Sequence, residues 1–96
     1  MIVIAVKLYG RPGTGDELAE AFAEVARPSR EEPGCELYLA ARSQEDPDHF
    51  LLYEHYRDAA AHAEHRETEH FKRIVEGRVM PLVERRERAL YDLIAE

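Results

Sequence analysis

The stretch HAEHRETEHF (62–71) concentrates residues that could do chemistry: three histidines, three glutamates and one arginine. Imidazole and carboxylate groups can bind a metal ion, transfer protons, or simply face water. His62 and His65, three residues apart, could reach one ion, and a carboxylate with another histidine would complete a zinc or iron shell. However, the spacing from His62 to His70 is no recognised ligand pattern and the HExxH motif is absent, so we expect no metal site.

Helical geometry places two of these histidines beside the interior of the protein. On an ideal helix that begins at Asp58, His62 and His65 border the buried side, whereas Glu64 and Glu67 point outward. A neutral imidazole is the natural base near neutral pH, so His65 is a candidate catalytic base or anchor for an anion. The structural alternative is that His65 only ties the helix junction together through hydrogen bonds to backbone groups.

His70 follows Thr68, which can cap the next helical segment. The dipole at the start of that segment opposes a positive charge, so we expect a lowered pKa and a neutral ring for His70. His70 has the same structural alternative as His65, namely hydrogen bonds to the backbone at the helix junction.

Glu54 shares one face of a predicted strand with apolar and aromatic residues, where a carboxylate must pair, accept hydrogen bonds or hold a proton. We expect Glu54 to form a salt bridge with Arg42 or Arg57, or to accept hydrogen bonds from backbone amides. A role as general base is the alternative. Tyr38 and Tyr53 could present hydroxyl groups to a pocket, although tyrosine on a strand more often serves packing.

Several apolar residues of the predicted helices form the helical half of the core, and some would line any cavity: Leu18, Phe22, Val25, Phe71, Ile74 and Val75. The residues that we expect to contact a substrate are Phe22 and Phe71 together with Tyr38, Glu54, His62 and His70. Cys35 is expected to be a small buried hydrophobe rather than a nucleophile.

The composition excludes several classes of partner. Thirteen basic and 20 acidic residues give a formal net charge of −7, and no cluster of Lys and Arg has interleaved aromatics, so we expect no nucleic acid partner. The longest apolar run, Met1 to Val6, is far shorter than the roughly 20 residues that cross a bilayer, and no basic segment precedes it. A single cysteine agrees with a reducing compartment. We therefore expect a cytoplasmic protein without a membrane partner.

The hydrophobic periodicity predicts the order of elements. Alternating or β-branched runs predict strands at 2–9, 35–42, 49–56 and 88–94, and helical spacing predicts helices from 15 toward 33, at 59–66 and after 68. Thr14 and Glu17 match a capping box, Asp58 matches an N-cap, and Pro28 should kink the first helix. The order β-α-β-β-α-β is that of the ferredoxin-like α+β fold, in which both helices cover one face of a four-stranded antiparallel sheet.

This arrangement, one domain over residues 1–96, leaves the second face of the sheet uncovered. Apolar residues on both faces require a second cover, because an exposed apolar patch of several hundred Å² is uncommon on a monomer. The simplest cover is the same face of a second copy, which predicts a two-fold homodimer with a barrel-like interface.

Three segments carry a family resemblance: EEPGCELYLA (31–40), DPDHFLLYEHY (46–56) and DAAAHAEHRETEHF (58–71). These segments resemble the antibiotic biosynthesis monooxygenase family in three motifs. The motifs are E-P-G-C with a tyrosine three residues after the cysteine, a proline-containing turn before Phe and E-x-Y, and the run T-x-H-F. The resemblance extends over essentially the whole chain. Members of that family are dimeric α+β barrels, and they include quinol monooxygenases, anthrone-type oxygenases, haem-degrading enzymes and a signal-molecule isomerase.

The resemblance implies a reaction that needs neither a metal nor a flavin. In the oxygenases of that family a phenol or hydroquinone is deprotonated in an apolar pocket between helices and sheet, and the anion gives an electron to O2. Haem-degrading relatives carry a tryptophan at the position of His65 and an asparagine in the first strand. This chain has no Trp and no Asn in IVIAVKLY (2–9), which disfavours haem as a substrate.

We therefore expect a cofactor-independent monooxygenase that oxidises a small electron-rich aromatic (a quinol, phenol or anthrone) with O2, with His65 as base or anchor. The alternative is a non-catalytic dimeric module that binds a small aromatic ligand. A cavity of about 300 Å³ or more, with His65 and a tyrosine hydroxyl converging in it, would favour the enzyme, whereas a pocket filled by its own side chains would favour the module.

Overall fold

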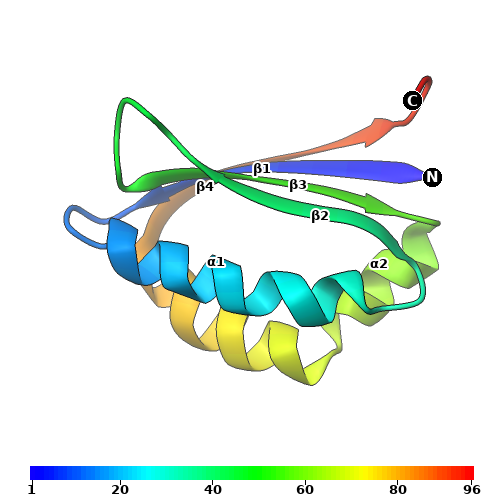
Figure 1. Ribbon diagram of the computed structural model, residues 1–96, viewed down its shortest axis with the longest axis horizontal. Coiled ribbons are helices and arrows are strands. Elements are labelled where there is room, and N and C mark those ends of the chain that lie inside the picture. Colours follow the sequence, from blue (N-terminus) through cyan, green and yellow to red (C-terminus); the bar gives the residue numbers. More distant parts are fainter.

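A four-stranded antiparallel sheet forms one layer of the protein in a computed structural model that describes residues 1–96. The strands are β1 (Ile2–Gly10), β2 (Cys35–Arg42), β3 (His49–Tyr56) and β4 (Val83–Asp92), in the spatial order β2-β3-β1-β4. Every neighbouring pair is antiparallel, and β1 and β3 are the two central strands, with β1 pairing with both β3 and β4 (Figure 1).

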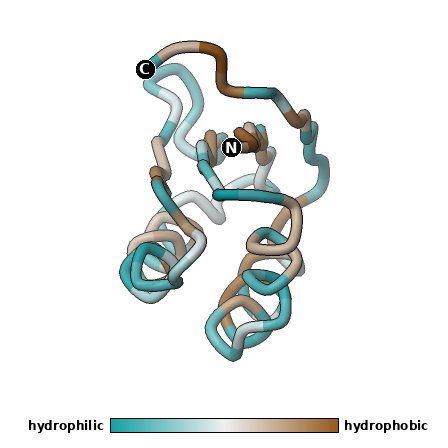
Figure 2. Tube along the Cα trace, turned by 90° about the vertical axis from the view of Figure 1, so that its right-hand side faces the viewer, coloured by the Kyte–Doolittle hydropathy of each residue, from teal (hydrophilic) through white to brown (hydrophobic).

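The helices form the second layer, all on one face of the sheet. They are α1 (Gly15–Arg30), α2 (Ala59–Arg66), the π-helix η1 (Phe71–Val79) and the short 3-10 helix η2 (Met80–Leu82). Figure 2 shows the helices on one side of the sheet and none on the other. The ferredoxin-like β-α-β-β-α-β arrangement predicted from the sequence is therefore confirmed.

The core lies between these two layers, because the strands alternate as their sequence period of two requires. Its residues come from the helix-facing side of the sheet and from the inner sides of α1 and η1, and the largest fully buried ones include Tyr38, Tyr56, Phe22, Ile4, Leu18 and Ile74. Glu54 shares this buried face, as its position in β3 predicts.

The start of α1 differs from the sequence prediction. Thr14 makes no side-chain cap, and its hydroxyl instead donates to the carbonyl of Arg11 at 2.6 Å. The carboxylate of Asp48, from the turn between β2 and β3, accepts hydrogen bonds from the amides of Gly13 and Gly15 at 3.1 and 2.8 Å. A residue distant in sequence has taken the place of the expected capping box because the β2-β3 turn lies directly against the start of α1.

The second half of the chain confirms some local predictions and corrects others. Asp58 caps α2, since its side chain accepts a hydrogen bond from the amide of Ala61 at 2.8 Å, and the hydroxyl of Thr68 accepts one from the amide of Phe71 at 3.2 Å. The segment after Thr68 is a π-helix rather than an α-helix, and β4 begins at Val83 rather than at Arg88. Charged residues on an edge strand hide the apolar alternation there, whereas backbone pairing with β1 decides the strand.

The face of the sheet opposite the helices has exposed apolar side chains. Leu39, Leu51 and Tyr91 are 48%, 40% and 57% exposed, and Tyr53 borders a depression on the same face. No helix in the protein combines the length and the apolar character needed to cross a membrane.

Candidate active site

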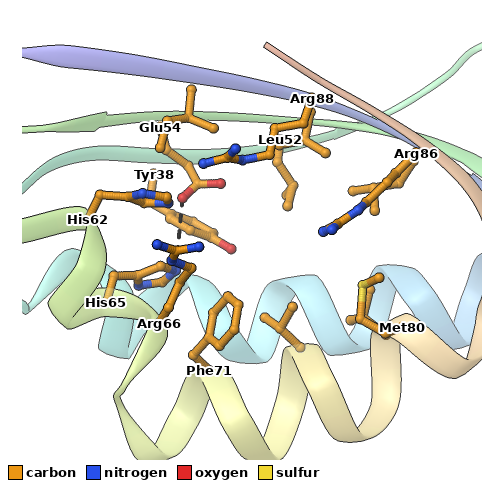
Figure 3. Close-up of a pocket in the computed structure, with 15 residues that line it drawn as sticks. Tyr38, Leu52, Glu54, His62, His65, Arg66, Phe71, Met80, Arg86 and Arg88 are labelled. Atoms are coloured by element: carbon orange, nitrogen blue, oxygen red, sulfur yellow. Dashed lines mark ion pairs between the residues drawn. The ribbon is translucent and has the colours of Figure 1, made fainter. Parts of the chain in front are cut away.

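The candidate site is a cavity of about 140 Å³ between the helices and the sheet, lined by fifteen residues of which nine are hydrophobic. The apolar wall comes mainly from β1 and η1. Figure 3 shows His62, His65, Glu54 and Tyr38 gathered at one end of the cavity, with Met80 and Arg86 toward the other. The cavity is smaller than the roughly 300 Å³ that would favour the enzyme over the non-catalytic module, but polar and titratable groups do converge in it.

His65, on α2, is held by a carboxylate that comes from the segment between α1 and β2. Its Nδ1 lies 2.8 Å from Oε2 of Glu32, and Nε2 of His70 lies 2.5 Å from the same oxygen. An ionised carboxylate only accepts hydrogen bonds, so both histidines donate to Glu32 through these nitrogens. The expected backbone partners of the two imidazoles are therefore wrong: the side chain of Glu32 joins them instead.

The hydrogen bond from Nδ1 leaves the lone pair of His65 on Nε2, provided that the ring is neutral. Burial of His65, which is 2% exposed, lowers its pKa below the ordinary value, although the hydrogen bond to Glu32 opposes this effect. Nε2 lies on the side of Glu54, 3.9 Å from its Oε1, as the dashed line in Figure 3 marks. His65 thus carries an unprotonated nitrogen at the polar end of the cavity near neutral pH.

His62, one turn before His65 on α2, also lines the cavity. Burial, and after it the positive charges of Arg66 and Arg88, lower the pKa of His62 to about 4. The rings of His62 and His65 are nearly parallel, with an interplanar angle of 23° and centroids 6.3 Å apart. Both cavity imidazoles are therefore neutral at physiological pH.

Glu54 faces the cavity from β3 without the arginine partner predicted from the sequence. Arg42 pairs with Asp16, and Arg57 pairs with the neighbouring Asp58. Glu54 instead accepts a hydrogen bond from the hydroxyl of Tyr56 at 2.6 Å. Burial raises the pKa of Glu54 to about 7, against the lowering effects of that hydrogen bond and of the charge of Arg88. The carboxyl group therefore retains its proton to a higher pH than an exposed glutamate does.

The tyrosines separate onto the two faces of the sheet. Tyr38 is 1% exposed, lines the cavity and has its ring centroid 5.8 Å from that of His65. Burial raises the pKa of Tyr38 above its ordinary value, so its hydroxyl remains protonated and can donate a hydrogen bond. Tyr53 lies on the opposite face, away from the cavity.

The structure gathers most, but not all, of the residues predicted to contact a substrate. Phe71 lines the cavity and meets the ring of His65 edge-on, with centroids 5.1 Å apart. His70 contacts Glu32, the same carboxylate that holds His65, and does not line the cavity. Phe22 packs against Phe50 in the core, with centroids 5.1 Å apart, and borders a separate depression beside α1.

Five further residues of this site were not singled out from the sequence: Glu32, Tyr56, Arg66, Arg86 and Arg88. Arg86 and Arg88 are two residues apart, a spacing that puts both on one face of a strand, but the predicted strand began only at Arg88. Glu32 precedes Pro33-Gly34 in a loop, where no local pattern indicates its distant partners.

Glu32, His65 and His70 also form the only cluster of three potential metal ligands, with donor atoms within 4.8 Å of one another. Two histidines and one carboxylate are a donor set that zinc or iron accepts. The ligand atoms of a tetrahedral zinc ion lie about 3.3 Å apart, as bonds of about 2.0–2.1 Å require. The observed separations of 2.5 and 2.8 Å instead match hydrogen bonds.

Cys35, at the start of β2, is half-buried and not disulfide-bonded. Burial, and then the negative charge of Glu32, raise the pKa of its thiol to about 11. The thiol is therefore protonated and a poor nucleophile.

Comparison with known proteins agrees with the fold. Residues 1–77 match the antibiotic biosynthesis monooxygenase family. The uncharacterized protein sll1783 of Synechocystis sp. is 32% identical over 75 residues, which are 78% of this chain and 51% of that protein, so the chain spans about half the length of this relative. The chain therefore belongs to the antibiotic biosynthesis monooxygenase family.

Solved structures are similar over nearly the whole chain. A crystal structure of an antibiotic biosynthesis monooxygenase has a TM-score of 0.89 at 28% identity and covers 99% of this chain and 100% of its own. PA3566 from Pseudomonas aeruginosa has a TM-score of 0.89 at 28% identity, with 98% and 94% covered. A Nitrosomonas europaea protein assigned to the same family has a TM-score of 0.92 at 27% identity, with 99% and 100% covered.

Proposed function

We propose that the protein is a cytoplasmic monooxygenase that oxidises a small electron-rich phenol or quinol with O2 and uses neither a metal nor a flavin. The observation that carries this proposal is the neutral His65, whose Nδ1 is engaged by Glu32 while Nε2 remains free at the polar end of an apolar cavity. Membership of a monooxygenase family supports the reaction class, and the single free cysteine supports the compartment.

In this mechanism Nε2 of His65 accepts the proton of the substrate hydroxyl, and Glu32 stabilises the imidazolium that forms. The hydroxyl of Tyr38 and the protonated form of Glu54 are the donors available to hold the phenolate. The phenolate then reduces O2. For a hydroquinone with a free ring position, one oxygen atom enters the ring and the other leaves as water with two hydrogens from the substrate, which gives a hydroxyquinone without an external reductant.

The size of the cavity selects among the aromatic substrates. Its volume of about 140 Å³ is close to that of an engineered cavity of about 150 Å³ that binds benzene. A single ring therefore fits, whereas a three-ring anthrone would require the cavity to open. We accordingly narrow the expected substrates to single-ring phenols and quinols.

A second candidate function is a non-catalytic module that binds a small aromatic ligand. The observation that favours it is the same small volume, about half of what a typical ligand pocket of about 300 Å³ or more provides. Such a module would bind the aromatic ring but would not need a free base, so loss of the Nε2 lone pair would leave its affinity unchanged.

We further propose that the protein is a homodimer built on the uncovered face of the sheet. Leu39, Leu51, Tyr53 and Tyr91 support this assembly, because a cluster of exposed apolar side chains on one face is costly in water. Family members resemble one another in this form of assembly, and a two-fold axis would place each cavity on the outer flank of the dimer.

The test is oxygen consumption by metal-stripped protein with a panel of hydroquinones. His65→Ala is expected to lower the rate by about 10²–10⁴-fold, the usual effect of removing a general base. His49→Ala, which removes a partly exposed histidine at the far end of β3, is the matched control and should retain the wild-type rate. No uptake with any hydroquinone would refute the oxygenase, and uptake unaffected by His65→Ala would remove His65 from the mechanism.

Glu32→Gln tests the positioning role of the carboxylate through the pH profile. The hydrogen bond to Glu32 raises the pKa of His65, so the variant should have a weaker base, a lower rate, and an acid limb of kcat/KM shifted to lower pH. A lower rate with an unchanged acid limb would show that Glu32 supports only the fold.

A further inference from the structure

Three guanidinium groups surround the cavity and have no evident task in the reaction described above. Arg66 comes from α2, and Arg86 and Arg88 come from the helix-facing side of β4. We propose that the substrate carries an anionic group, a carboxylate in the simplest case, that these arginines bind. The inference rests on the proposed function, because it narrows the substrate of that same site to a single-ring phenol with an acidic substituent.

The arginines of β4 differ according to the face that they occupy. Arg85, on the uncovered face, pairs with Glu87 at 2.9 Å and lies over the ring of Tyr9, 4.0 Å from its centroid. Arg86 and Arg88, on the cavity face, form no ion pair with any carboxylate of the chain, and neither does Arg66. Among the arginines of β4, the two that lack a carboxylate partner are therefore the two that border the cavity.

The charge at the cavity is opposite to that of the protein. The chain has a formal net charge of −7, yet the cavity lining has three arginines and a single carboxyl group, Glu54. Glu54 is already engaged by the hydroxyl of Tyr56 at 2.6 Å, and burial favours its neutral form. Three arginines thus face a single carboxyl group in the cavity lining, and an anionic guest would offset this excess of positive charge.

The site has one region that fits the aromatic ring of the substrate and another that fits its anionic group. A wider surface depression of about 670 Å³ adjoins the cavity and shares Arg66, Phe71, Val75, Met80 and Arg86 with it. The two carboxylates of this depression are Glu67, which pairs with Lys72 at 3.6 Å, and Glu76. An aromatic ring inside the cavity would reach His65 and direct a carboxylate toward Arg86, which lines both the cavity and the depression.

Figure 3 shows the guanidinium of Arg86 reaching into the space between the sheet and η1, and that of Arg88 close to the carboxyl group of Glu54. A guanidinium binds a carboxylate through two parallel hydrogen bonds, which fix the orientation of the guest as well as its charge. The arginines would therefore set which ring hydroxyl faces Nε2 of His65.

The experiment compares an acid with its neutral ester on the same ring. The affinities of 2,5-dihydroxybenzoate and methyl 2,5-dihydroxybenzoate are measured by calorimetry without oxygen, so that no turnover occurs. We expect the acid to bind at least about tenfold more tightly, an advantage that falls at about 0.5 M NaCl because partly exposed charges are screened. The double variant Arg86→Gln/Arg88→Gln should abolish this advantage, whereas Arg85→Gln, the neighbour on the opposite face, should retain it.

Equal affinity for acid and ester would overturn the inference, as would an advantage that survives in the double variant. These failures are distinct from failure of the proposed function. If the ester binds as well as the acid and is oxidised, the oxygenase stands and the anion site does not. If the acid binds preferentially through Arg86 and Arg88 but no oxygen is consumed, the anion site stands and the oxygenase does not.

Discussion

The substitution Glu54→Gln should make the stability of the protein less dependent on pH. Burial raises the pKa of Glu54 from 4.5 to about 7, so the folded state retains the proton up to about pH 7 while the unfolded chain releases it near pH 4.5. The contribution of Glu54 to the stability of the fold is therefore fully present below about pH 4.5 and is lost as the pH rises through about 7. With about 1.4 kcal/mol for each tenfold change in proton affinity, ionised Glu54 costs the folded state about 3 kcal/mol at alkaline pH.

Glutamine keeps the carbonyl oxygen that accepts the hydrogen bond from Tyr56 and cannot ionise. The free energy of unfolding in urea is measured at about pH 5 and about pH 9, and the gain of the variant over the wild type should be larger by about 2–3 kcal/mol at the higher pH. Glu36→Gln, an exposed carboxylate on the adjacent β2, controls for the loss of one negative charge. A difference between Glu54→Gln and wild type that is the same at both pH values would refute the reasoning.

Three other substitutions test the assembly and the local structure. Leu51→Lys, on the uncovered face, should convert a dimer into a monomer in size-exclusion chromatography with light scattering, and an unchanged mass would contradict the proposed interface. Asp58→Ala should lower the free energy of unfolding by about 1 kcal/mol because the cap on the amide of Ala61 is lost, whereas Asp58→Asn should retain most of it in the same urea titration. Gly77→Ala should raise the thermal midpoint, with a gain of about 0.5–1 kcal/mol, since an added Cβ comes no closer than 3.5 Å to the carbonyl oxygen of Lys72. A lower midpoint would show that the π-helix requires glycine at this position.

The sequence by itself determined the features that depend on neighbours along the chain. The period of two placed Glu54 on the buried face of β3, and the side chain of Asp58 starts α2 as predicted. Helical spacing directed His62 and His65 toward the interior, where both are buried. These features follow from φ/ψ preferences and side-chain direction, which act over a few residues.

Tertiary structure alone decided which side chains meet. Glu32 reaches His65 and His70, 33 and 38 residues away, because the loop after α1 comes to lie against the junction of α2 and η1. Likewise the register between β1 and β4 brings Arg86 and Arg88 to the cavity, although the charged sequence of β4 carries little strand signal. Contacts of this kind, and the volume that the packed layers leave between them, depend on how distant elements dock, which no local pattern in the sequence encodes.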